Sequence, residues 1–146
     1  TIKADMRDLP CLPGANFDLV YQAPSMGYVP DVREVYAQVV SVLKSGGVYR
    51  VDAGDPGVQF ADDTWESGYR ITEPFSTKSR TREDGGVEFR HYLSDVFNGL
   101  VEVGFEIQQV DEMPGHMNMD PNAEPGSWDH ILGHLPWIFA VVARKK

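Results

Sequence analysis

A strand, a capped helix and a second strand follow one another within residues 17–51, and this succession limits the possible folds more than any other feature. Residues 17–21 are apolar and lie between turn-forming residues, which is typical of a short buried strand. Asp31 is a good helix N-cap, and the apolar side chains after it recur at helical spacing as far as Lys44. A second strand is expected to begin at Val48. Because one helix joins the two strands, they should pair in parallel, so the sequence predicts an α/β fold.

The C-terminal half is expected to complete the same sheet. Residues 93–101 have an apolar helical face, and residues 105–113 have the partial alternation of a strand. Ser127 can cap a short helix that runs through His134, and residues 137–143 form an apolar run suited to a central strand. The sequence therefore predicts a single domain made of all 146 residues.

An insertion or lid is expected within this domain, at residues 53–92, because the periodicity fails there. Residues 69–75 and 87–92 are predicted to be the two strands of a hairpin. The charged, glycine-containing segment 78–86 separates them.

Composition excludes several classes of partner. The formal net charge of −9 argues against nucleic acid and against an anionic membrane surface as partners. No apolar run approaches the length of about 20 residues that a membrane span requires. The single cysteine, Cys11, excludes an internal disulfide, which suits the cytoplasm. We therefore expect a cytoplasmic protein with a small molecule or another protein as its partner.

The N-terminal sequence carries the most specific motif. Ala4-Asp5-Met6-Arg7-Asp8-Leu9-Pro10 precedes the strand at residues 17–21, and Leu43-Lys44-Ser45-Gly46-Gly47-Val48 follows the helix. This order resembles the middle of a class I S-adenosylmethionine-dependent methyltransferase, and the resemblance extends to the end of the chain. It implies a partial Rossmann-like sheet, mixed, with about four core strands in the order first, second, last, third. The last strand is then antiparallel to its neighbours.

The resemblance also implies a cofactor site for S-adenosylmethionine. In that family the pair of residues after the third strand meets the adenine, and by position this pair is Asp5 and Met6. The end of the next strand, here Gln22 and Ala23, lines the methionine side of the cofactor. From the residues alone, Asp5 and Met6 are equally a loop acid and a core methionine.

A small-molecule methyl acceptor is expected to lie beyond this site. Met26 and Tyr28 stand where the family covers the cofactor or meets the substrate. His91 is a candidate general base, although a histidine at this junction is also suited to anchor the following helix by hydrogen bonds.

Two further segments offer substrate-binding residues. Asp55 lies in a loop past the carboxyl end of a strand, where ligands sit in open α/β sheets, although a tight turn explains it as well. Tyr69 and Arg70, with Trp65, form either a wall of the substrate site or packing beneath the lid. His130 and His134 are four residues apart on a predicted helix, a spacing that can serve a metal, but no further ligand motif accompanies them, so we assign no metal site.

The family's glycine-rich cofactor loop and its acidic ribose ligand have no counterpart in these 146 residues. We therefore expect the chain by itself to bind S-adenosylmethionine weakly or not at all. The strand at residues 17–21 would also keep a free edge, which predicts a homodimer through that edge. Two functions follow: methyl transfer to a small molecule in the complete form, or a truncated, inactive remnant that serves as a self-associating or interaction module. A metal hydrolase is a distant third.

Overall fold

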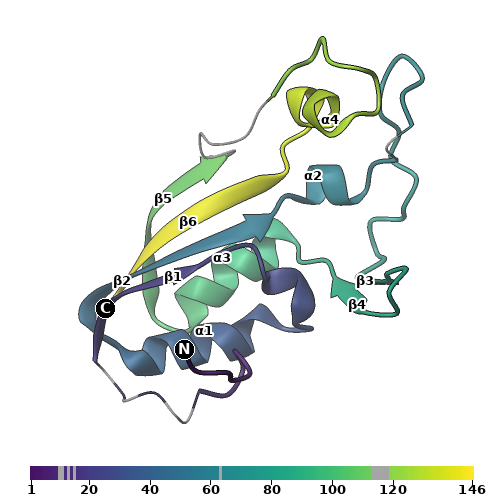
Figure 1. Ribbon diagram of the computed structural model, residues 1–146. Coiled ribbons are helices and arrows are strands. Elements are labelled where there is room, and N and C mark those ends of the chain that lie inside the picture. Colours follow the sequence, from purple (N-terminus) through teal and green to yellow (C-terminus); the bar gives the residue numbers. More distant parts are fainter. Residues whose placement is uncertain (10–11, 13, 15, 63, 113–118) are drawn as a thin grey trace.

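The fold is an α/β structure built around one mixed sheet (Figure 1). The computed structural model describes residues 1–9, 12, 14, 16–62, 64–112 and 119–146. The sheet has four strands in the order β1-β2-β6-β5. Their bounds are Phe17–Gln22 for β1, Leu43–Gly54 for β2, Phe105–Glu112 for β5 and Ile138–Lys145 for β6.

The direction of the strands agrees with the predicted topology. β1 pairs with β2 in parallel, and β6 runs antiparallel to both β2 and β5. The order first, second, last, third is therefore confirmed, as is the antiparallel last strand. β1 is an edge strand, and on it the side chains of Leu19 and Tyr21 are 60% and 58% exposed.

Two helices pack on one face of this sheet and enclose the core (Figure 1). They are α1, Val32–Val42, and α3, Leu93–Glu102. Tyr49 of β2 lies at the centre, with its ring centroid 5.9 Å from that of Tyr36 and 5.5 Å from that of Phe105. All three rings are buried, so apolar burial joins α1, β2 and β5 in one core.

Helix α1 begins as predicted but ends earlier. The Asp31 carboxylate accepts a hydrogen bond of 2.9 Å from the backbone N–H of Arg33, which caps the first turn. The helix ends at Val42, because Leu43 is fully buried and already extended as the first residue of β2. Lys44 therefore does not serve the helix terminus. Its ammonium instead contacts the Asp18 carboxylate at 2.9 Å.

The hairpin of the insertion differs from the prediction, because its first strand lies later in the chain and its second strand ends at Phe89 and not at Tyr92. The hairpin consists of β3, Ser79–Thr81, and β4, Val87–Phe89. The strand expected at residues 69–75 is wrong: this segment makes only an isolated bridge from Ile71 to Ala61. Pro74 lacks the N–H that a ladder needs. The ring of Phe75 stacks on Tyr92 instead, with centroids 4.4 Å apart.

Three short helices surround the end of the sheet at which β2 stops and β6 starts (Figure 1). They are η1, Met26–Tyr28, then α2, Pro56–Gln59, and α4, Trp128–His134. The predicted cap of α4 is confirmed, since the Ser127 hydroxyl accepts from the His130 N–H. Among the described residues no helix is long and apolar enough to cross a bilayer.

Candidate functional site

Gln22, the last residue of β1, connects this strand to β2 and to a turn bridged by Asp5 and Asp8, which we call the N-terminal turn. Its Oε1 accepts a hydrogen bond from the buried hydroxyl of Tyr49. Its Nε2 lies 3.0 Å from Ser25 Oγ, 3.5 Å from the sulfur of Met26 and 3.7 Å from the sulfur of Met6. We call Met6, Gln22, Ser25 and Met26 the Gln22 cluster. It brings together three residues that the sequence had assigned to cofactor or substrate.

Ala23 and Tyr28 flank the Gln22 cluster at the surface. Ala23 is exposed directly after β1, and Tyr28 is exposed at the end of η1. Met26, by contrast, is buried beneath them.

Asp5 lies on a different side of the N-terminal turn. Its carboxylate makes a two-pronged ion pair with the guanidinium of Arg7, at 2.8 and 3.1 Å, and the hydrogen bonds from Arg7 lower the pKa of Asp5 to about 2. Asp5 lines a shallow surface pocket together with Glu34 and Gln38 of α1. The two expected adenine ligands are thus separated: Met6 belongs to the Gln22 cluster and Asp5 does not.

Two buried carboxylates mark the end of β2. Asp52 is 1% exposed, and it accepts from the Tyr21 hydroxyl at 2.9 Å and from Arg50 at 3.1 Å. Asp55 caps α2 by accepting from the Gly57 N–H at 2.7 Å. Burial raises the pKa of the Asp55 carboxyl above its usual range. In the structure Asp55 therefore stabilises the turn at the start of α2, which is the alternative to ligand binding that the sequence offered.

His91 anchors the hairpin end of the insertion to η1. Its Nε2 lies 2.9 Å from the carbonyl oxygen of Met26, and because a carbonyl only accepts, the Nε2–H donates. The sequence left open an anchoring contact to the helix that follows, α3, but the observed partner is η1. Nδ1 makes no hydrogen bond with the described residues, so in the neutral ring it is the nitrogen that can accept a proton.

Tyr69 belongs to an aromatic cluster over α4. The Tyr69 hydroxyl lies 2.6 Å from His130 Nδ1, and the ring of Trp65 is 4.6 Å from that of His130 and 4.8 Å from that of His134. Arg70 points elsewhere and pairs with Glu66 at 3.4 Å. Within the described part of the chain no group of three or more possible metal ligands gathers, at this histidine pair or elsewhere.

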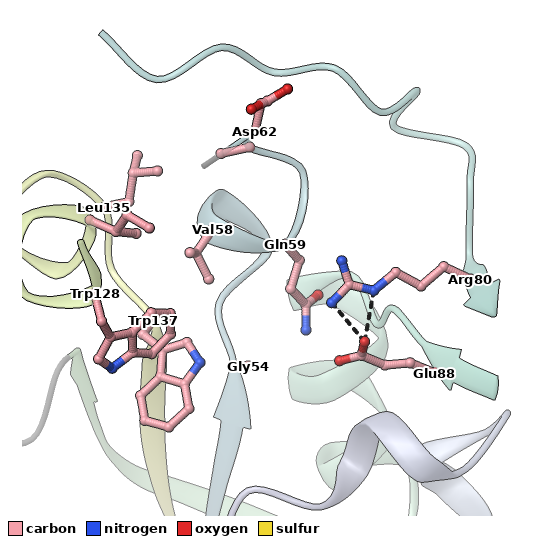
Figure 2. A pocket seen from close by; sticks show the side chains of 11 residues that line it. Gly54, Val58, Gln59, Asp62, Arg80, Glu88, Trp128, Leu135 and Trp137 are labelled. Atoms are coloured by element: carbon pink, nitrogen blue, oxygen red, sulfur yellow. Dashed lines mark hydrogen bonds and ion pairs between the residues drawn. The ribbon is translucent and has the colours of Figure 1, made fainter. Parts of the chain in front are cut away.

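A cavity of about 450 Å³ lies beyond the carboxyl end of β2, between α2, α4 and the β3–β4 hairpin (Figure 2). We call it the α2–α4 cavity. Sequence reasoning missed it, because its walls come from the insertion and from the segment around α4, where no periodicity marks a site. Its lining consists of Gly54, Val58, Gln59, Ala61, Asp62, Arg80, Glu88, Trp128, Ile131, Leu135 and Trp137.

The cavity and the Gln22 cluster adjoin through the contact between η1 and β4. A Cβ atom placed on Gly27 would lie 3.5 Å from Glu88 Cγ and 3.5 Å from the carbonyl oxygen of Phe89. Glu88 also lines the cavity, where Arg80 pairs with it at 2.7 Å. Glu88 therefore contacts η1 and also lines the cavity.

Known proteins resemble this chain in sequence. Residues 1–51 match the methyltransferase domain family. The methyltransferase phqN of Penicillium fellutanum is 27% identical over 110 residues, which are 72% of this chain and 30% of that protein.

Solved structures share the fold over almost the whole chain. An S-adenosylmethionine-dependent methyltransferase from Mesorhizobium loti superposes with a TM-score of 0.75 at 24% identity, covering 97% of this chain and 67% of that one. Geranyl diphosphate C-methyltransferase from Streptomyces coelicolor A3(2) superposes with a TM-score of 0.60 at 12% identity, covering 98% and 52%.

The fold is that of the Rossmann-like methyltransferases. With the match of residues 1–51 to the methyltransferase domain, the chain is similar to S-adenosylmethionine-dependent methyltransferases in its first third by sequence and along nearly its whole length by fold. The chain spans 30% of the length of the Penicillium relative and 67% of the Mesorhizobium structure.

Stability should respond to pH through Asp55 in a particular direction. Because its folded pKa is raised, its contribution to stability is complete below the ordinary aspartate pKa of about 3.9 and is lost as the pH rises through the folded pKa. Asp55→Asn keeps an oxygen for the Gly57 N–H but cannot ionise. Urea unfolding at pH 3.5 and pH 7 should show the variant gaining free energy of unfolding, relative to the parent chain, as the pH rises.

Asp62→Asn is the matched control with the opposite sign. Hydrogen bonds from Thr64 lower the pKa of Asp62, so its contribution is present above the ordinary value and lost as the pH falls. This variant should lose stability relative to the parent as the pH rises. The same trend in both variants would contradict the assignment.

Proposed function

We propose that this chain supplies part of the cofactor site and the acceptor side of an enzyme that transfers a methyl group from S-adenosylmethionine to a small molecule. The Gln22 cluster is the observation that carries the proposal. It lies at the carboxyl end of a parallel strand, which is where ligands bind in open α/β sheets. The Streptomyces relative, whose structure holds geranyl diphosphate and S-adenosyl-L-homocysteine, supports a small-molecule acceptor.

The cofactor contacts are divided between the N-terminal turn and β1. Met6 and Ala23 offer apolar contacts beside the amide of Gln22. We propose that Gln22 and Ala23 line the methionine side of the cofactor and that Met6 contacts its adenine ring. Asp5 would accept from the adenine amino group after exchanging its contact with Arg7, a pair that is solvent-exposed and so weakly held. S-adenosylmethionine supplies a methyl group on a cationic sulfur, and the protein mainly positions the acceptor and excludes water.

Acceptor binding is assigned to the side of η1 and the insertion. Met26 and Tyr28 cover the cofactor, and His91 is the proposed general base through Nδ1, since Nε2 is held by the Met26 carbonyl. Asp55, at the end of β2, is proposed to orient the acceptor. Tyr69 and Arg70 do not line the α2–α4 cavity, so we propose that they contact the acceptor only at its outer side.

The second candidate is an inactive remnant that self-associates. The exposed edge of β1, with two large apolar side chains at Leu19 and Tyr21, favours it. An unpaired edge strand offers backbone donors and acceptors to another chain. The two candidates differ in cofactor binding, which can be measured directly.

Calorimetric titration with S-adenosylhomocysteine tests the enzyme proposal. The full-length product of the reading frame should bind it with micromolar affinity, whereas the 146-residue chain alone should bind at millimolar concentration or not at all. In the full-length product, Ala23→Leu adds bulk at an exposed position and should weaken binding at least tenfold without loss of a buried contact.

Val101→Leu is the control for that titration, because Val101 is exposed on α3, away from the Gln22 cluster. Its affinity should equal that of the parent. Absence of heat from the full-length product at millimolar ligand would overturn the enzyme proposal and favour the remnant.

Self-association through β1 predicts a dimer of the 146-residue chain at micromolar concentration. Leu19→Lys should shift the molar mass measured by light scattering toward that of a monomer, because an edge lysine opposes strand pairing. Val101→Lys places the same charge on an exposed position of α3 and should leave the mass unchanged. A parent chain that is monomeric throughout this range would rule out the homodimer.

A further inference from the structure

We infer that the α2–α4 cavity binds a planar aromatic small molecule that carries an N–H or O–H donor, and that this is the chemical class of the methyl acceptor. The acceptor role rests on the proposed function, whereas the binding itself does not. The shape, the chemistry and the position of the cavity each favour such a ligand.

One wall of the cavity is aromatic and aliphatic. The rings of Trp128 and Trp137 meet edge to face, with centroids 5.2 Å apart, and Ile131 and Leu135 of the α4 region continue the apolar surface. Aromatic side chains favour offset or edge-to-face contact with another ring. In the view of Figure 2 the two indoles lie on one side of Gly54, opposite the Arg80–Glu88 pair.

The other wall offers a hydrogen-bonding group without a partner. Oε1 of Gln59 is buried and makes no hydrogen bond with the described residues. A buried oxygen left in this state is unfavourable. The terminal torsion of glutamine is soft, so the amide can turn and present this oxygen to a ligand in the cavity that it lines. A donor on the ligand would satisfy it.

The Arg80–Glu88 pair limits the charge of the ligand. Arg80 and Glu88 neutralise each other at 2.7 Å, so this pair attracts neither a strong anion nor a strong cation. Asp62 is the remaining charged residue of the lining, and its carboxylate opposes an anionic ligand. The volume of about 450 Å³ is within the range of small-molecule sites, about 300–1,000 Å³, and suits a bicyclic ring system. A neutral, flat molecule with one donor fits the shape and polarity of the cavity.

The position of the cavity connects this ligand to methyl transfer. The cavity lies past the carboxyl end of β2, and its residue Glu88 packs on η1, which contributes Met26 to the Gln22 cluster. A ligand held against the tryptophans would therefore have one edge facing the side on which the cofactor is proposed to lie.

The test uses indole as the probe and indene as its isostere without the N–H. The 146-residue chain is titrated with each up to 2 mM while the tryptophan indole N–H resonances are followed by NMR. Trp128 and Trp137 should shift in a saturable manner, whereas Trp65, which packs on His130 and His134 outside the cavity lining, should shift less. Indole should bind about three- to tenfold more tightly than indene, the ratio expected of one hydrogen bond.

Two variants assign the contacts. Trp128→Ala should weaken indole at least tenfold, and since this side chain is 46% exposed its loss should leave the fold intact. Gln59→Met should bring the indole-to-indene ratio close to one while indene binding stays within twofold of the parent. Val101→Ala, on α3, should behave as the parent.

The outcomes separate this inference from the proposed function. Saturable binding with these variant effects supports the cavity even if S-adenosylhomocysteine does not bind to the full-length product, in which case only the acceptor role fails. Absence of saturable shifts, or equal affinity of indole in the parent and in Trp128→Ala, overturns the inference even if the cofactor binds.

Discussion

Tyr49 connects the core of this protein to its candidate site. Its ring is buried between Tyr36 of α1 and Phe105 of β5, and its hydroxyl donates to the amide of Gln22 at the end of β1. That amide in turn contacts the sulfurs of Met6 and Met26. Packing of the core therefore fixes the place of the amide, and the amide fixes the N-terminal turn and η1. The geometry proposed for the cofactor depends on this one buried ring.

The helices and strands of the main sheet could be predicted, because the apolar spacing and capping residues of each element lie within its own sequence. The helical apolar spacing after Asp31, the serine cap of α4 and the apolar run of β6 each agree with the structure. The sequence predicted that α1 continues to Lys44, but the helix ends at Val42, because Leu43 is extended and buried in the core as the first residue of β2. No local signal distinguishes these two uses of an apolar residue.

The insertion was harder to predict because its contacts are distant in sequence. Residues 69–75 have the composition of a strand, yet Phe75 stacks on Tyr92 and Tyr69 bonds to His130, 61 residues away. The α2–α4 cavity likewise draws Gln59, Glu88 and Trp137 from three separate segments. The resemblance to a family singled out Met6, Gln22 and Met26, but only the structure shows that the sulfurs of Met6 and Met26 meet at the amide of Gln22, whereas Asp5 pairs with Arg7.

If the Gln22 cluster contacts the cofactor as proposed, the methyl groups of its two methionines report on this contact directly. With ¹³C-labelled methionine methyls in the full-length product, addition of S-adenosylhomocysteine should shift the resonances of Met6 and Met26. The resonance of Met119, which is exposed and outside the cluster, should stay unchanged. Saturable binding that leaves Met6 and Met26 unshifted would contradict the account.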